Sequence, residues 1–600
     1  MDTITCKLAS LMSSQSKQES FQNLETSQNL NISEQGLIDI IGPVSVCIQE
    51  SVTIGKNVFP DIELFTSYDH DESKCIFSKL DKTKLVGSKS FLKELLKNPS
   101  CDLSLLNNKK TFLENFNFTN IDKFLDKLKV LEDDMLWMYT NVRDSDDISS
   151  LCDIVYFSNM FLKILNTQGT LLTTLNLYRI SISPVIGILT PIVYLIVPYM
   201  VLRFKFKLNG FSFISYIKLI VNNFFTISGF GGSSSIVKYF SGIISVFFFF
   251  QGLFNSLEVS KLSYKISKFL VNKINKIIDF IVTAEELYDH YWSSDISKCF
   301  FIEKEYTCKY EYVSISTETF SLCTNFGENL KCFRYFNHNN YINLIRKVYI
   351  LDCLTSIKKL EYSYPDFMNV DSIKPVLTIS DMWHPSIEDP VSNSIELTEQ
   401  SSMIITGPNA GGKSTLIKSI LIILILSQSI CVVPAKSIQL TPFKYINSQI
   451  NIPDCKGKES LFEAEMYRSK ENLDQLKVLD GQKSIIFMDE IFNSTNPIEG
   501  IAGAYAILKK IATYKSNITI FTTHYLYLTK LSKAFPDIFI NMKMNVVKTS
   551  DNERITYPYK LSKGISNQYI ALELLKQNNF DSEIIKDALE IKSKLVALKS

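Results

Sequence analysis

The sequence predicts a mixed α/β domain on the carboxy-terminal side, preceded by a mainly helical region that carries a hydrophobic insert. Three observations support this prediction. An apolar run, a glycine-rich turn and a second apolar segment follow one another over residues 402–426, in the order strand, loop, helix. Two further short apolar runs, at 484–488 and 518–523, each end at polar side chains. Before residue 363, long segments repeat apolar residues at helical spacing.

The composition limits the class of protein. A chain of 600 residues is too long for one core, so about two to four domains are expected. The net charge of +1 excludes a globally basic nucleic-acid binder but leaves room for local basic patches. The 12 cysteines include no C-x-x-C pair, which favours reduced thiols and argues against zinc. We therefore expect an intracellular protein, in the cytoplasm or the nucleus.

The amino-terminal half holds a disordered start and an unusually apolar middle. Residues 1–35 are polar and rich in Ser, Gln and Asn, so we expect disorder and no signal peptide there. Residues 184–202 are uncharged and long enough to cross a bilayer, and a second apolar run follows at 239–254. Pro191 and Pro198 interrupt the first run, which disfavours a membrane span. A membrane hairpin and a buried helical insert both stay open.

Residues 407–414 fit the pattern G-x-x-x-x-G-K-[ST], in which backbone N–H groups close around phosphate oxygens. Lys413 would reach the β- and γ-phosphates, and the Ser414 hydroxyl would bind Mg²⁺. The alternative is a plain glycine-rich turn, which the flanking strand and helix disfavour. We therefore expect ATP and Mg²⁺ to be bound here. The predicted nucleotide-binding residues are Gly407, Pro408, Asn409, Ala410, Gly411, Gly412, Lys413, Ser414 and Thr415.

Polar side chains at the ends of two later strands complete the predicted site. Asp489 would hold Mg²⁺ together with Ser414, and Glu490 would orient and deprotonate the attacking water. The strand at 518–523 delivers His524 to the same edge of the sheet, where it would contact the γ-phosphate or its water. The alternatives are an acidic strand end at a turn and a structural histidine.

Several motifs together resemble the ATPase domain of the MutS family. They are T-G-P-N-A-G-G-K-S-T at 406–415, S-L-F-E-A-E-M at 460–466, D-E-I-F-N-S-T-N at 489–496 and T-T-H-Y at 522–525. His384-Pro385 and Y-K-L-S-K-G-I-S at 559–566 also resemble family motifs, and L-D-K-T-K-L-V-G at 80–87 resembles the start of the family's helical core. The resemblance covers about 363–575 strongly and about 64–130 weakly.

The resemblance implies an ABC-type P-loop ATPase domain at 363–575 and a helical core and lever region at 36–362. The helix expected at 576–600 would serve either dimerisation or plain packing. The resemblance also implies a homodimer, or a heterodimer with another MutS-like subunit, in which Ser494, Thr495 and Asn496 complete the nucleotide site of the other subunit. Such a protein couples ATP binding and hydrolysis to mismatched or branched double-stranded DNA, as in DNA mismatch repair.

Departures from the family pattern leave alternatives open. About sixty residues precede the helical core, too few for the amino-terminal mismatch-recognition domain, so we expect a divergent branch that lacks it. F-N-S-T-N replaces the usual G-R-G-T-S, and the aromatic that stacks on adenine is not evident before Ile395. The main reading is a DNA-binding MutS-like ATPase. The alternatives are a membrane-anchored MutS-related ATPase without direct mismatch recognition, and an inactive homologue.

Overall fold

The computed structural model describes most of the chain. The described ranges are 50–144, 154–205, 212–218, 235–293, 295–296, 326–334, 338–369, 374–398, 402–450, 461–479, 481–548, 555–566 and 580–597. They form two compact units, described separately below. The described residues of the first unit fall within 123–289 and 326–345, and those of the second within 50–122, 290–296 and 346–597. The expectation for residues 1–35 lies outside the described residues, and the predicted domain boundaries stay predictions.

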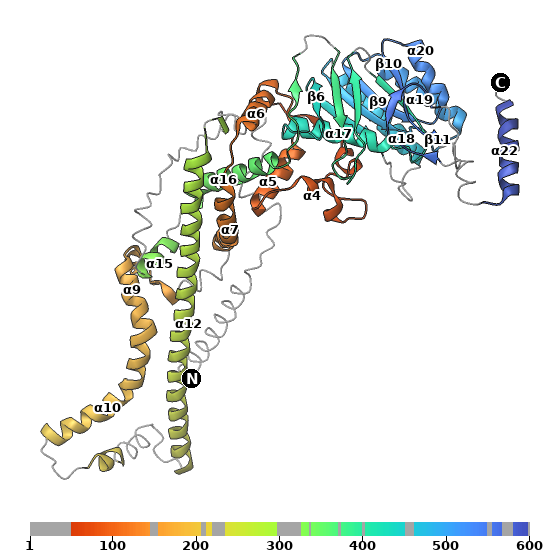
Figure 1. Cartoon of the computed structure of the whole chain (residues 1–600). Helices are drawn as coiled ribbons and strands as arrows, with labels where there is room; N and C mark the ends of the chain where they lie inside the picture. The colour runs from red at the N-terminus through yellow and green to blue at the C-terminus, as the bar shows by residue number, and fades with distance from the viewer. Residues whose placement is uncertain are drawn as a thin grey trace. The chain divides into compact units, whose positions relative to one another are not determined.

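The second unit is built around a seven-stranded sheet in the order β1-β7-β8-β9-β5-β10-β13 (Figure 1). All neighbouring strands are parallel except β10 and β13. The strands are β1 (Thr53–Ile54), β5 (Ser402–Thr406), β7 (Tyr445–Gln449), β8 (Ser484–Asp489), β9 (Asn517–Thr523), β10 (Phe539–Met544) and β13 (Leu561–Lys563). Every residue of β5, β7 and β9 is buried, as expected for parallel strands covered on both faces. The predicted mixed α/β class is confirmed.

Two smaller sheets belong to the same unit. One has the order β2-β6-β3-β4, and the other pairs β11 with β12. Their strands are β2 (Asp366–Phe367), β3 (Leu377–Met382), β4 (Asn393–Leu397), β6 (Ser437–Leu440), β11 (Val547–Lys548) and β12 (Ile555–Thr556). The loop between β3 and β4 lies beside the glycine-rich turn that follows β5, because residues of both line the same cavity.

The helices of the second unit include one that is buried on every side over most of its length. The helices are α3 (Val58–Asp61), α4 (Ile76–Leu80), α5 (Val86–Lys97), α6 (Leu103–Asn115), α17 (Lys413–Ser429), α18 (Leu461–Val478), α19 (Pro497–Ile511), α20 (Leu531–Ala534) and α22 (Ser582–Ala597). Short 3₁₀ helices are η2 (Glu72–Lys74) and η6 (Leu526–Lys530). All residues from Ser419 to Ser429 of α17 are buried, which explains why its sequence lacks an amphipathic pattern.

The segment before residue 122 is part of the sheet unit. The buried carboxylate of Asp61 accepts hydrogen bonds from Ser448 Oγ (2.7 Å) and Ile450 N (3.1 Å), just after β7. Asp352 lies in α16 (His338–Lys358) and accepts from Lys84 N (3.0 Å) and Leu85 N (2.9 Å). Asp352 therefore caps the start of α5 from a distant part of the chain.

The first unit is helical in its described residues. Its helices are α7 (Ile121–Asp144), η3 (Lys163–Thr167), α9 (Gly169–Leu177), the π-helical turn η4 (Tyr178–Ile182), α10 (Ser183–Lys205), α12 (Ser235–Tyr291) and α15 (Phe326–Arg334). α12 is the long helix of Figure 1. Lys273 of α12 forms a buried ion pair with Asp134 of α7 and lies 5.0 Å from the Trp137 ring centroid. These contacts hold α7 against α12.

The hydrophobic insert is helical, and much of its described surface is exposed. Residues 184–202 lie within α10, and 239–254 lie in the first part of α12, where the side chains of 235–249 are outside the described set. Exposed apolar side chains of α10 include Val185, Ile186, Ile188, Leu189, Val193, Ile196, Val197, Met200, Val201 and Phe204. These side chains are exposed, so the alternative of a buried helical insert does not apply to them. By length and composition, one helical run among the described residues could cross a membrane, Gly169–Leu189, which overlaps the predicted span only at 184–189.

Candidate nucleotide-binding site

A glycine-rich turn joins the buried strand β5 to the buried helix α17. Ala410 and Gly412 have φ angles of 62° and 87°, a left-handed conformation that glycine adopts most easily. A Cβ on Gly411 would lie 3.0 Å from the Pro408 carbonyl oxygen, and one on Gly412 would lie 3.0 Å from Cδ1 of Tyr559. The turn therefore needs glycine for its tight backbone and for the close approach of Tyr559.

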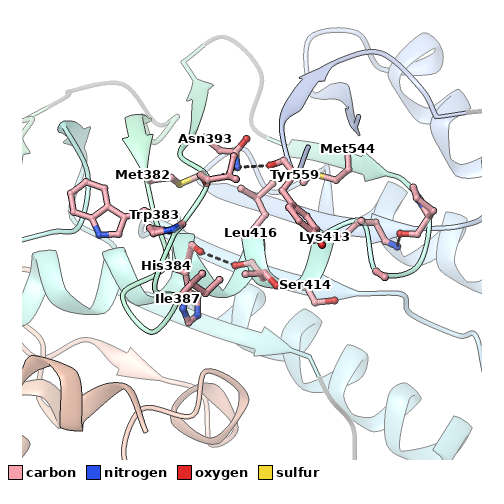
Figure 2. Close-up of a pocket in the computed structure, with 18 of the residues that line it drawn as sticks. Met382, Trp383, His384, Ile387, Asn393, Lys413, Ser414, Leu416, Met544 and Tyr559 are labelled. Atoms are coloured by element: carbon pink, nitrogen blue, oxygen red, sulfur yellow. Dashed lines mark hydrogen bonds between the residues drawn. The ribbon is translucent and has the colours of Figure 1, made fainter. Parts of the chain in front are cut away.

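A cavity of about 520 Å³ lies over this turn (Figure 2). This volume is within the range of small-molecule sites. Eight of the nine predicted nucleotide-binding residues, Pro408 to Thr415, line it. The ninth, Gly407, offers its carbonyl to Lys413. The apolar part of the wall is made by Met382, Trp383, Ile387, Pro390, Val391, Met544 and Tyr559.

Lys413, Glu490 and His524 come together beside the glycine-rich turn, where Lys413 and Glu490 line the cavity and His524 lies next to them. Lys413 Nζ lies 3.1 Å from Oε1 of Glu490 and 3.2 Å from Nε2 of His524. It also donates to the carbonyls of Gly407 and Pro408, each at 3.1 Å. His524 Nε2 lies 2.5 Å from the same oxygen of Glu490. The structure thus brings together three residues that the sequence places in separate motifs.

Glu490 directly follows β8 in a strained backbone conformation. Its φ angle is 48°, and that of Phe492 is 60°, values that residues with a side chain rarely adopt. Burial raises the pKa of Glu490, but the hydrogen bond from His524 and the charge of Lys413 outweigh this effect, so the net pKa lies below its ordinary value. Glu490 is therefore ionised at neutral pH. Its second oxygen, Oε2, accepts a hydrogen bond of 2.9 Å from Asn493 Nδ2.

Asp489 and Ser414 supply the kind of ligands that Mg²⁺ prefers. Asp489 is the last residue of β8, and its Oδ1 accepts a hydrogen bond from the Thr522 hydroxyl of β9. Ser414 lines the cavity in the first turn of α17. Within the described residues no group of three or more His, Cys, Asp or Glu side chains could hold a metal. A carboxylate and a hydroxyl fit Mg²⁺, which binds few protein groups and completes its shell with phosphates and water.

Ser494, Thr495 and Asn496 do not line the cavity of their own chain. Ser494 Oγ donates to Oε2 of Glu465 (3.0 Å), a buried carboxylate of α18. The Asn496 side chain accepts from Ile498 N (3.0 Å) and so caps α19, whose first residue is Pro497. The loop is therefore held at both ends by its own subunit, and its predicted role toward a second subunit stays a prediction.

Residues outside the predicted nucleotide-binding set also form part of the cavity wall. Tyr559 lies against Gly412 and supplies an aromatic ring, and Trp383, before Ile395, supplies a second one that the sequence analysis did not single out. Asn393 of β4 fixes the segment of Tyr559, because its Nδ2 donates to the Tyr559 carbonyl (2.9 Å) and its Oδ1 accepts from Leu561 N (2.8 Å). Figure 2 shows the first of these contacts. One sequence signal pointed here, the family-like motif at 559–566.

His384 also lines the cavity, in the loop between β3 and β4. Burial and the nearby charge of Lys418 lower the pKa of His384 to about 4. Its Nδ1 accepts from Ser386 N at 3.3 Å. The imidazole is therefore neutral at physiological pH and acts as a hydrogen-bonding part of the loop.

The fold and the site define a mixed α/β protein with a glycine-rich turn and a cavity at the carboxyl ends of parallel strands. Residues 403–596 match the family described as MutS domain V. The chain is 31% identical over 277 residues to the DNA mismatch repair protein Msh3 of Dictyostelium discoideum, covering 42% of this chain and 19% of that protein. It is 33% identical over 247 residues to MutS protein homolog 4 of Homo sapiens, covering 39% and 25%. Residues 403–596 are therefore a domain of the MutS family. The chain spans about a fifth to a quarter of the length of these relatives.

Proposed function

We propose that this protein binds and hydrolyses ATP as one subunit of a MutS-type dimer, and that it couples this cycle to binding of mismatched or branched double-stranded DNA. The observation that carries the proposal is the cluster of Lys413, Glu490 and His524 beside the glycine-rich turn. A buried lysine shared between backbone carbonyls and one carboxylate is well placed to be taken over by phosphate oxygens, which offer it more negative charge.

The chemistry is the transfer of the γ-phosphoryl group to water. Glu490 accepts a proton from the attacking water, the bond between the γ-phosphorus and the bridging oxygen breaks, and ADP and phosphate leave. Lys413 and the backbone N–H groups of the turn stabilise charge on the phosphates, and His524 orients the water or the γ-phosphate. Bound Mg²⁺, held by Ser414 and Asp489, would neutralise part of the phosphate charge.

The apolar part of the cavity suits a nucleobase. Tyr559 offers a ring face, and Val391 and Ile387 offer aliphatic surface. Replacing Tyr559 with Ala should weaken ATP binding and leave binding of inorganic tripolyphosphate unchanged, because only the base would lose its partner. Equal loss for both ligands would show that Tyr559 serves the phosphate turn instead.

The first unit offers a basic stripe for DNA phosphates. Lys261, Lys265 and Lys268 are exposed, and their spacing places them on one face of α12. Within the described residues, none of these three lysines forms an ion pair with a carboxylate. Phosphate contacts by three lysines predict a salt-dependent affinity, so changing all three to Gln should lower the slope of log K against log [salt] by about 3. The same change at Lys509, Lys510 and Lys515 of the second unit is the matched control.

Steady-state ATP hydrolysis tests the main proposal. The purified full chain would be assayed with and without mismatched, matched and branched duplexes, at low and moderate salt. A change of rate with DNA supports coupling, and the most effective duplex identifies the preferred structure. The proposal also places the protein inside the cell, in the cytoplasm or the nucleus. Unchanged turnover together with no DNA retention at low salt would refute the DNA part.

A second candidate function, a membrane-anchored MutS-related ATPase without direct mismatch recognition, is favoured by the exposed surface of α10. Its exposed apolar side chains lie around much of the helix, whereas a helix on a protein surface exposes its polar face. Arg203 and Lys205 are exposed at its end, where a membrane surface would place basic groups. Flotation with phosphatidylcholine vesicles tests this function. The Val193→Lys and Val197→Lys double variant should lose flotation, and Val130→Lys on α7 is the control.

A further inference from the structure

The loop after β8 carries a contact to Glu490 that the proposed mechanism does not use. Asn493 Nδ2 donates to Oε2 of Glu490 at 2.9 Å, on the side of the carboxylate opposite to Lys413 and His524. The two oxygens of Glu490 are thus held by different elements. Oε1 is held by α17 and by the residue after β9, and Oε2 is held by the loop that follows Glu490 itself.

The backbone on both sides of Asn493 is anchored by a second carboxylate. Glu465 of α18 accepts from the Ser494 hydroxyl (3.0 Å) and from the backbone N–H of Phe492. The Phe492 ring is buried and lies 5.5 Å from Phe462, and its carbonyl accepts from the Tyr525 hydroxyl (3.2 Å). A residue between two such anchors has a defined position even though its own side chain is exposed.

We propose that Asn493 is a positioning residue for the Glu490 carboxylate, and that Glu465 fixes the place of Asn493 by holding its two neighbours. This inference rests on the proposed function and deepens it. The side-chain amide sets the rotation of the carboxylate, so that one oxygen stays with Lys413 and His524 while the other is kept from turning toward them. The loop that holds Ser494 is thereby linked to the base through one side chain.

The charged groups around Glu490 set what a substitution at Asn493 does. Lys413 and His524 face Oε1 of Glu490. Asp489, the last residue of β8, directly precedes Glu490 in the chain. Tyr525 and Glu465 lie near Glu490 on the other side of the loop after β8. Asn493→Asp keeps the shape of the side chain and replaces the donor with a second carboxylate against Oε2. Two like charges at hydrogen-bond distance repel each other, so the variant side chain would displace the Glu490 carboxylate instead of holding it. The variant therefore changes the charge at the base with little change in volume.

Single-turnover ATP hydrolysis at fixed pH, with ATP affinity measured in parallel, tests the proposal. Asn493→Asp, which replaces the donor to Glu490 with a like charge, should lower the rate about tenfold or more with unchanged ATP affinity. Asn493→Ala should lower the rate about tenfold, equivalent to about 1.4 kcal/mol, with unchanged ATP affinity. Asn115→Asp is the matched control, because exposed Asn115 loses an amide hydrogen bond of the same length, 2.9 Å, to the Thr111 carbonyl. An Asn493→Asp protein with the wild-type rate overturns the proposal.

A double-mutant cycle tests the part played by Glu465. If Glu465 acts through Asn493, Glu465→Ala and Asn493→Ala each lower the rate, and the double variant is no slower than the slower single variant. Additive losses would show that Glu465 does not act through Asn493. Thermal unfolding in parallel shows whether Glu465→Ala simply loosens the fold, and Glu465→Gln, which keeps the acceptor, should recover most of the rate.

A measurement without turnover separates this proposal from the proposed function. If the wild-type chain fails to hydrolyse ATP, the proposed function fails, but the contact can still be tested by stability. Asn493→Asp should unfold at a lower temperature at pH 8 than the wild type. Adding Glu490→Gln restores an amide-to-carboxylate pair in the reverse sense, and should return the melting temperature toward that of the wild type. No recovery in the double variant would overturn the contact.

Discussion

Replacing Glu490 with Gln should separate nucleotide binding from hydrolysis. The substitution keeps the shape of the side chain and an acceptor oxygen but removes the negative charge between Lys413 and His524. A general base typically contributes about 10²- to 10⁴-fold to the rate, so turnover should fall by that factor. Because the Gln amide cannot accept a proton near neutral pH, raising the pH should not restore the rate of hydrolysis.

The same change should tighten ATP binding. Lys413 is only 3% exposed, and its ion pair with the carboxylate, which is 28% exposed, must open when phosphates take the lysine. A hydrogen bond to a charged group stabilises by about 1.5–3 kcal/mol. Gln keeps a weaker, neutral acceptor, so we expect about 1 kcal/mol of this competition to be removed. The dissociation constant for ATP should then fall about fivefold.

Two assays on one preparation measure both effects. Isothermal titration calorimetry with Mg²⁺-ATP gives the affinity, and release of radiolabelled phosphate in a single turnover gives the rate. Glu499→Gln is the matched control, because Glu499 is an exposed carboxylate in the first turn of α19. Normal turnover by Glu490→Gln would remove Glu490 as the base. Weaker ATP binding would refute the competition for Lys413.

Three further outcomes follow from contacts of the second unit. Lys413→Ala should weaken ATP binding about 10- to 100-fold in the same titration, since the phosphates lose a charge-assisted partner; unchanged affinity would remove Lys413 from the site. Burial raises the pKa of Asp61 from 3.8 to about 6, so Asp61 binds a proton more tightly in the folded protein than in the unfolded chain. The free energy of unfolding should therefore fall by about 3 kcal/mol as the pH rises from about 4 to above 6. Asp61→Asn should flatten the melting temperature over this pH window, and a curve of wild-type slope would contradict the assignment. Asp352→Ala should cost about 2–4 kcal/mol in urea unfolding of this unit, because Lys84 and Leu85 lose the acceptor for their N–H groups; a cost below 1 kcal/mol would show that water replaces it.

The strands and helix around the glycine-rich turn could be predicted because their signals are local. Each strand is a short apolar run that ends at a polar residue, and parallel strands bring these ends to one edge of a sheet. That reasoning predicts Lys413, Glu490 and His524 at one edge of the sheet, where the structure brings their side chains together. The residues themselves therefore contained enough information for the centre of the site.

The other parts of the site depend on contacts between distant segments. Tyr559 reaches Gly412 because Asn393 holds its backbone, and a hydrogen bond across 166 residues leaves no local pattern. Asn493 was visible as a departure from the family motif, but its bond to Glu490 depends on the left-handed backbone at Glu490 and Phe492. Apolar composition likewise could not decide whether the side chains of α10 are covered, because exposure depends on what packs against them.

The two edges of the large sheet have a consequence for dissecting this protein. Its edge strands, β1 and β13, are only two and three residues long, so they offer few open hydrogen-bonding groups for another chain to pair with. β1 comes from residues 53–54, far ahead of the other strands in the sequence. A fragment that begins at residue 363 would leave β7, five buried residues long, as an uncovered edge. Such a fragment should aggregate by strand addition, so soluble pieces of this protein need to retain the segment that carries β1.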